Sequence, residues 1–175
     1  MSNLSQYRKY IAFVDGGCKN NGKANAFAYG SFRVYDVTGR EEEIFTGSFS
    51  LPDPKKVCEL HPLMESTRFQ VNGFMEGTSR PTNNLAEAAS MYTLLSTLQR
   101  TGIFKEASVD VYCDSQLIVR QLMGIYRISN KALKKIHANT KAVMLQASSQ
   151  THRSVGELVT LHHYSGDDMK LILGH

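Results

Sequence analysis

The order in which strand-like and helix-like segments follow one another is the feature that most limits the folds open to this chain. Three strand-like runs come first, at about residues 8–15, 26–36 and 42–51, and short polar turns separate them. This spacing predicts an antiparallel meander. From Thr82 onward, helical and strand patterns alternate. Because a meander followed by such alternation builds a single sheet flanked by helices, we predict an α/β fold with a mixed five-stranded sheet.

The second half of the chain carries the predicted helices and the remaining strands. Apolar periodicity and the end signals Gly102 and Gly124 define these segments. The predicted helices and strands cover, in turn, residues 82–102, 115–124 and 130–148, and residues 107–114 and 157–164. A final helix is expected after residue 164, and we leave open whether it is truncated. We therefore expect one domain, residues 1–175.

The stretch after the third predicted strand interrupts this pattern. Three of the four prolines lie between residues 52 and 66, and proline disfavours both helix interiors and central strands. We predict an insertion at about residues 52–80, with a short helix in its first part and an extra strand near 67–75. The insertion could supply a strand, a dimer contact or a substrate-binding lid.

Composition places the chain among globular proteins without disulfides. Its 175 residues are 42% hydrophobic and 21% charged, and no run of 18 apolar residues occurs, so no transmembrane helix is expected. The three cysteines include no C-x-x-C pair, which argues against a disulfide framework or a structural zinc site. We predict a cytoplasmic protein. The net charge of +4 is compatible with a nucleic-acid partner but is too small to identify one.

Three acidic residues stand where carboxylates would project from the edge of the sheet. Asp15 and Asp114 each follow an apolar strand, and Glu87 shares a helical stripe with Met91. In open α/β sheets, ligands gather at the carboxyl ends of the strands. Converging carboxylates repel one another unless a cation binds them, and an all-oxygen set suits Mg²⁺ or Mn²⁺. The pattern indicates phosphoryl transfer or phosphodiester hydrolysis.

Each of these residues also has an ordinary structural interpretation. Asp114 could cap the helix that follows it, and Glu87 could favour a helix N-terminus through the macrodipole. Asp15 could be a solvated turn residue. Cys18 and Cys113 are better explained by packing than by reactive thiols.

The segments around the three acids resemble the motifs of the ribonuclease H family. They are DGGCKNNG, TNNLAE and YCDSQ, in the family's order. The resemblance implies a βββαβα(α)βα fold and an endonuclease that hydrolyses the RNA strand of RNA–DNA hybrids. It also implies that Asp15, Glu87 and Asp114 are catalytic carboxylates that bind two Mg²⁺ ions, for which Mn²⁺ could substitute.

The resemblance further implies a set of residues that bind the hybrid. They lie in the first turn, at the start of the helix after Thr82 and just beyond Asp114: Gly16, Cys18, Asn21, Asn83, Asn84 and Gln116. Amide side chains suit this role because proteins distinguish a hybrid from DNA through its shallow minor groove and its 2′-hydroxyl groups. Asn21 could instead be a turn residue, and Thr82, Asn83 or Asn84 could cap the helix.

The last segment, HHYSGDDMK, departs from the family pattern. The family has a mobile His after its last strand and a fourth acid at the start of its final helix, and the spacing between them is not reproduced. We predict Asp168 as the fourth catalytic and metal-binding acid, with Asp167 or a residue beyond His175 as the alternatives. His163 is the predicted mobile histidine and His162 its alternative, and both could be ordinary strand-end residues.

Two other functions remain open. Holliday-junction resolvases share the sheet and the carboxylates, and closely spaced acids also begin their last helix, but they lack the T-N-N and DS-Q amides. A catalytically inactive nucleic-acid-binding module would explain a missing fourth acid. The chain has no Trp and lacks the family's Trp-rich basic protrusion. Lysines of the 130–148 helix could contact phosphates in its place, or could simply face solvent.

Overall fold

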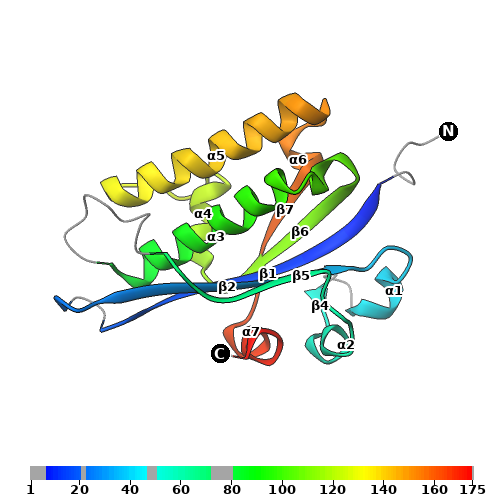
Figure 1. Cartoon of the computed structure of the whole chain (residues 1–175), viewed down its shortest axis with the longest axis horizontal. Coiled ribbons are helices and arrows are strands. Elements are labelled where there is room, and N and C mark those ends of the chain that lie inside the picture. The colour runs from blue at the N-terminus through cyan, green and yellow to red at the C-terminus, as the bar shows by residue number, and fades with distance from the viewer. Residues whose placement is uncertain (1–6, 21–22, 47–50, 72–80, 175) are drawn as a thin grey trace.

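The computed structural model describes residues 7–20, 23–46, 51–71 and 81–174. Its elements follow the chain in this order: β1 (Arg8–Lys19), β2 (Phe27–Asp36), α1 (Glu41–Ile44), β3 (Phe45–Thr46), β4 (Leu51–Pro52), α2 (Pro54–Cys58), β5 (Met64–Gln70), α3 (Asn83–Arg100), the 3₁₀ turn η3 (Ile103–Lys105), β6 (Ala107–Cys113), α4 (Gln116–Leu122), α5 (Lys131–Thr151), α6 (Val155–Leu158), β7 (Val159–His163) and α7 (Gly166–Leu173). Helices α3, α4 and α5 cover one face of the sheet, here called the upper face (Figure 1). Helices α1, α2 and α7 lie on the other, the lower face.

Within the described residues, the main sheet has five strands in the order β5-β2-β1-β6-β7. Strand β2 pairs antiparallel with both β1 and β5, whereas β6 pairs parallel with both β1 and β7. The sheet is therefore a three-stranded meander extended by two parallel strands. This arrangement confirms the predicted mixed five-stranded sheet, and it makes β1 and β6 central neighbours.

The third strand of the meander is not where it was predicted. We expected it at about 42–51, but that stretch contains α1, β3 and the start of β4, and β3 pairs with β4 in a separate ribbon. Strand β5 extends the meander instead and overlaps the extra strand expected near 67–75, of which residues 72–75 lie outside the described part. Ile44 is fully buried in the lower core, so this residue of the first stretch contributes to packing and not to a long ladder.

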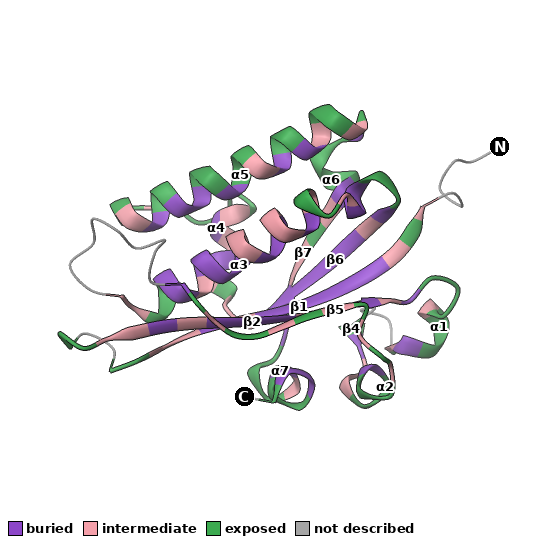
Figure 2. Ribbon diagram, in the orientation of Figure 1, coloured by how far each residue is buried: buried purple, intermediate pink, exposed green. Residues whose placement is uncertain are grey.

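Hydrophobic cores lie on both faces of the sheet (Figure 2). Because side chains alternate along a strand, β1 contributes Ala12 and Val14 to the upper core and Ile11 and Phe13 to the lower one. A strand covered on both faces needs consecutive apolar residues. This double covering explains the apolar run that precedes Asp15.

Helices α3, α4, α5 and α7 each begin at a side-chain cap. The caps are Thr82, Ser115, Asn130 and Ser165, and each side chain accepts a hydrogen bond from a backbone N–H in the first turn. The predicted helices at 82–102, 115–124 and 130–148 are confirmed as α3, α4 and α5. Because Ser115 caps α4, the alternative explanation of Asp114 as the cap is wrong.

The region predicted to be an insertion contains the expected short helix. Helix α2 follows Asp53, whose carboxylate accepts a hydrogen bond from the Lys55 N–H at 3.0 Å, and Pro54 occupies its first turn, where proline is favoured.

In the part of the chain that the structure describes, no helix combines the length and the apolar character needed to cross a membrane.

Candidate active site and metal centre

Asp15 and Asp114 project from the same edge of the sheet because their strands are parallel neighbours. Val14 of β1 lies opposite Cys113 of β6, and the next residue of each segment is one of the two acids. The parallel ladder of β1 and β6 ends at the pair of Val14 and Cys113, and α/β proteins bind ligands at the carboxyl ends of parallel strands. Strand β1 itself continues to Lys19 in its pairing with β2, so the predicted end of this strand at residue 15 is wrong. The strand pairing therefore brings together two acids that are 99 positions apart in the chain.

Glu87 reaches the same point because α3 lies very close to β1. A Cβ atom at Gly16 would lie 2.5 Å from the carbonyl oxygen of Ala86 and 2.7 Å from the backbone nitrogen of Glu87. Only glycine permits this approach of helix and strand. Asn83 adds a second tie, since its Oδ1 accepts a hydrogen bond from the Cys18 N–H at 2.8 Å. Gly16, predicted to bind substrate, thus has a structural role as well.

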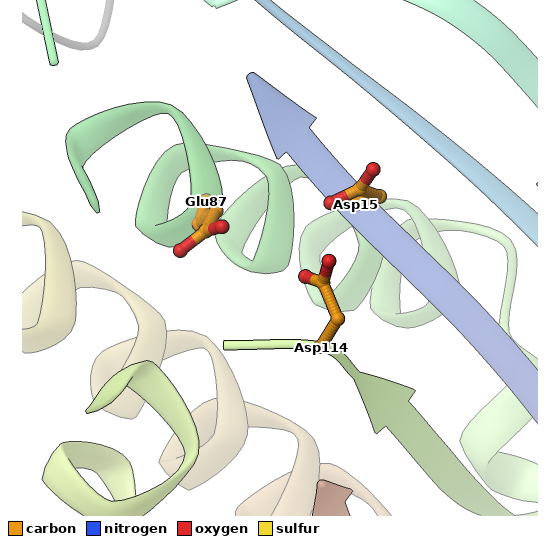
Figure 3. Close-up of side chains that lie close together, drawn as sticks. All are labelled: Asp15, Glu87 and Asp114. Carbon is orange, nitrogen blue, oxygen red and sulfur yellow. The ribbon is translucent and has the colours of Figure 1, made fainter. Parts of the chain in front are cut away.

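The carboxylates of Asp15, Glu87 and Asp114 face one another in a cluster (Figure 3). One oxygen of each lies within 4.8 Å of an oxygen of the other two, and all three side chains are half-buried. Oxygen ligands about 2 to 2.5 Å from a shared Mg²⁺ or Ca²⁺ ion are spaced in this way. No other group of His, Cys, Asp and Glu among the described residues has this spacing.

Burial raises the pKa of two of these acids. The pKa of Asp15 rises to about 7 through burial, and the charges of Asp114 and Glu87 raise it further. The pKa of Glu87 also rises to about 7 through burial, although a hydrogen bond with Ser115 opposes the shift. Both shifts mean that the charged carboxylates are unfavourable in the protein alone. A bound cation would reverse this balance by stabilising the ionised forms.

Asp114 supplies a direct test of whether a cation fits. Its Oδ1 is buried and has no hydrogen-bond partner among the described residues. A buried oxygen without a partner is costly, and a divalent cation would give it one. The cluster offers only hard oxygen donors, and this donor set fits Mg²⁺ or Mn²⁺.

The predicted substrate-binding residues lie around the acids. Asn83 and Asn84 are exposed in the first turn of α3, and Gln116 is exposed at the start of α4. Cys18 is half-buried near the end of β1, where its thiol lies 3.5 Å from the Pro81 carbonyl oxygen. The structure thus places two exposed helix starts beside the cluster. Asn21 lies outside the described residues.

His162 and His163 have different environments at the end of β7. His162 Nε2 lies 2.9 Å from Asp110 Oδ1, and its ring stacks on Tyr112 at a centroid distance of 4.8 Å. His163 is exposed, and both histidines line a cavity of about 420 Å³ together with Gln116. The two differ in that His162 is held by Asp110 and Tyr112, whereas His163 is more exposed.

The start of α7 lies beside the cluster, but its acids are not part of it. A Cβ atom at Gly166 would lie 3.6 Å from Asp114 Oδ2. Asp167 is exposed and Asp168 is half-buried, and among the described residues neither completes the group of three acids. Asp168 therefore stays a predicted ligand, on a helix that begins at the site.

Solved structures of other proteins have the same fold. The N-terminal RNase H domain of a Mycobacterium tuberculosis protein, solved as a fusion with maltose-binding protein, matches with a TM-score of 0.58 and 19% identity over 91% of this chain and 84% of that chain. LC11-RNase H1, isolated from compost by a metagenomic approach, matches with a TM-score of 0.56 and 21% identity over 92% and 87%. The chain has the ribonuclease H-like fold.

A third structure with the ribonuclease H-like fold is LC11-RNase H1 in complex with an RNA/DNA hybrid, with a TM-score of 0.55 and 22% identity over 91% of this chain and 87% of that chain. No family model matches the chain, and no curated protein matches it. At these identities the similarity establishes the fold, and the residues of the site carry the functional interpretation.

Two residues beside the cluster of acids were not predicted from the sequence. Ser115 caps α4 and also hydrogen-bonds Glu87. The guanidinium of Arg120 lies 2.7 Å from the side-chain oxygen of Gln116 when that amide is oriented to accept. Ser115 could have been found from its place within YCDSQ. Arg120 could have been found from its spacing of four residues from Gln116 on one helix.

Proposed function

We propose that this protein is a metal-dependent endonuclease that hydrolyses the RNA strand of RNA–DNA hybrids. The cluster of Asp15, Glu87 and Asp114 is the observation that carries the proposal. Asp15 and Glu87 have raised pKa values, and the buried Asp114 Oδ1 has no hydrogen-bond partner among the described residues. The hybrid bound to the similar LC11-RNase H1 supports the choice of substrate. We propose Mg²⁺ as the cofactor, with Mn²⁺ able to replace it.

The acids of the cluster would hold the metal ions, and Asp168 is the proposed fourth ligand. When bound, a pair of divalent ions supplies Lewis-acid activation of a water molecule and stabilises charge on the leaving 3′-oxygen. Asp15 and Glu87 would bind the ions as carboxylates, because a nearby cation would offset the burial and the neighbouring charges that raise their pKa values. Ser115, whose hydrogen bond lowers the pKa of Glu87, would help to orient this carboxylate.

The exposed amides would select the hybrid. Asn83 and Asn84 of α3 and Gln116 of α4 present donors and acceptors next to the acids, which suits the minor groove and the 2′-hydroxyls of an A-like duplex. Asn83 is held by the Cys18 N–H, so its orientation is set before substrate arrives. We propose that Asn21 contributes to the same surface and that His163 assists proton transfer or product release.

We further propose that residues 1–175 form one domain that acts in the cytoplasm, in which the region at about 52–80 is an insertion. The free cysteines Cys18, Cys58 and Cys113 are compatible with a reducing compartment.

Cleavage of an end-labelled RNA–DNA hybrid with Mg²⁺ tests the proposal, beside duplex DNA, duplex RNA and a four-way junction. Asp114→Asn removes a ligand charge while it preserves shape, so the rate on the hybrid should fall at least about a hundredfold with circular dichroism unchanged. Cleavage of the junction in preference to the hybrid would instead identify a resolvase. Binding of hybrid without cleavage would identify an inactive binding module, and equal rates for variant and wild type would refute the role of Asp114.

A further inference from the structure

The region between β2 and β5 packs beside α7 on the lower face of the sheet. We call its described residues 41–46 and 51–60 the lower-face segment, which comprises α1, β3, β4 and α2. Figure 1 shows α2 next to α7 beneath the sheet. Val57 of α2 is fully buried in the same core as Met169 and Ile172 of α7, and Figure 2 shows both helices turning buried residues toward each other and the sheet. Helix α7 is therefore packed on one side by this segment.

Hydrogen bonds tie both ends of α7 to its surroundings. Tyr164, just before the helix, donates its hydroxyl to the Pro52 carbonyl oxygen at 2.7 Å, and the pair is buried. The Cys58 thiol lies 3.2 Å from the Leu171 carbonyl oxygen. Arg33 of β2 donates to the Ile172 carbonyl oxygen at 2.6 Å.

These bonds matter because of where they fall on the helix. The last four carbonyl groups of a helix lack partners within it, and Leu171 and Ile172 belong to that set in α7. Cys58 of the lower-face segment and Arg33 of the sheet thus satisfy backbone groups that the helix cannot satisfy itself. An eight-residue helix is too short to be stable on its own, so these contacts decide where α7 lies.

The position of α7 in turn sets the distance between its acids and the metal site. Its N-terminal residue Gly166 lies against Asp114, and the Tyr164 N–H donates to the Cys113 carbonyl oxygen at 2.8 Å. Any tilt of α7 about this contact would move Asp168 relative to the cluster.

We propose that the lower-face segment positions α7 so that Asp168 can complete the metal site, with Val57 and Tyr164 as positioning residues. The inference rests on the proposed function for its catalytic consequence, but its structural part stands without it. The segment acts through packing and hydrogen bonds and touches neither metal nor substrate.

The test compares Val57→Ala and Tyr164→Phe with the matched control Val109→Ala, which removes the same methyl groups from the upper core. Hydrogen exchange of the α7 amides, measured without metal or substrate, should be at least tenfold faster in the two lower-face variants. The Mg²⁺ concentration for half-maximal hybrid cleavage should rise at least threefold, while the KM for hybrid stays within twofold. Val109→Ala should change neither the exchange of the α7 amides nor the Mg²⁺ concentration for half-maximal cleavage.

Exchange and Mg²⁺ dependence that match the control would overturn the inference. Tyr164→Phe deletes a single hydroxyl and serves as the test if Val57→Ala fails to fold. If the wild-type protein cleaves no hybrid, the proposed function fails. Calorimetric Mg²⁺ binding and α7 exchange in the same variants then still decide the positioning role, because neither needs turnover.

Discussion

Burial of the ionised Asp15 and Glu87 carboxylates lowers the stability of the folded protein at the place where a cation would bind. The pKa of Asp15 rises from its ordinary value of 3.8 to about 7, and that of Glu87 rises from 4.5 to about 7. Each shift measures how much less favourable the ionised group is in the folded protein than in the unfolded chain. Functional sites commonly carry such a cost.

This cost predicts a pH-dependent gain in stability for Asp15→Asn without divalent cations. Between about pH 4 and pH 7 the folded wild type holds a proton on Asp15 that the unfolded chain has lost, so the free energy of unfolding falls as pH rises through this window. We expect the variant to be more stable than the wild type by about 1–2 kcal/mol at pH 8, after allowance for partial exposure, and by less at pH 5.5.

Urea denaturation at both pH values in the presence of EDTA measures this difference. Adding Mg²⁺ should stabilise the wild type and leave Asp15→Asn unchanged, since the variant lacks a ligand charge. A gain of the same size at pH 5.5 and pH 8 would show that burial of the charge is not its cause.

Contacts between elements decide whether the acids meet at all. The contact of α3 with β1 at Gly16 places Glu87 beside Asp15, and the parallel pairing of β1 with β6 places Asp114 beside them. A change at such a contact should therefore affect stability and the site together.

Gly16→Ala is the substitution that tests the helix–strand contact. The new Cβ would overlap backbone atoms of Ala86 and Glu87, which cannot move as a flexible side chain would. We expect a loss of about 1–3 kcal/mol in the free energy of unfolding together with weaker Mg²⁺ binding, measured by urea denaturation and calorimetry. Gly156→Ala is the matched control, because nothing lies within 4 Å of its added Cβ. Equal effects of the two substitutions would contradict the role of Gly16.

On the scale of the whole molecule, charge and layering bear on how a duplex could dock. The chain carries a net charge of +4, and the lysines of α5 are exposed on the helix that covers the upper layer: Lys131, Lys134, Lys135 and Lys141. Binding of a polyanion releases counterions in proportion to the phosphate contacts that the protein makes.

Lys134→Gln combined with Lys135→Gln separates phosphate contact from simple solvation. If both lysines contact phosphates, the slope of log KM for hybrid against log salt should become shallower by about one to two units, with kcat unchanged. Steady-state kinetics at about 50 to 200 mM KCl provides the slope, because the affinity of proteins for nucleic acids changes strongly over this range of salt. An unchanged slope would show that the two lysines face solvent and do not contact phosphates.

Most of the fold and the three acids could be predicted from the sequence because local patterns determine them. The apolar run before Asp15, the cap at Thr82 and the strand before Asp114 each lie within a few residues, and the structure contains β1, α3 and β6 at those places. Apolar runs and helix caps are local patterns, so the acids beside them could be found without knowledge of the fold, even though β1 continues past Asp15 to Lys19.

The tertiary structure alone decided which apolar stretch joins the sheet, why Gly16 must be glycine, and where α7 lies. Residues 42–51 alternate like a strand, yet Ile44 packs into the lower core while the more polar β5 takes the sheet edge. The position of Asp168 likewise depends on the packing of α7 against residues far away in the chain. Side chains far apart in the chain compete for the same buried surface, and the free energy of that packing is absent from any local pattern.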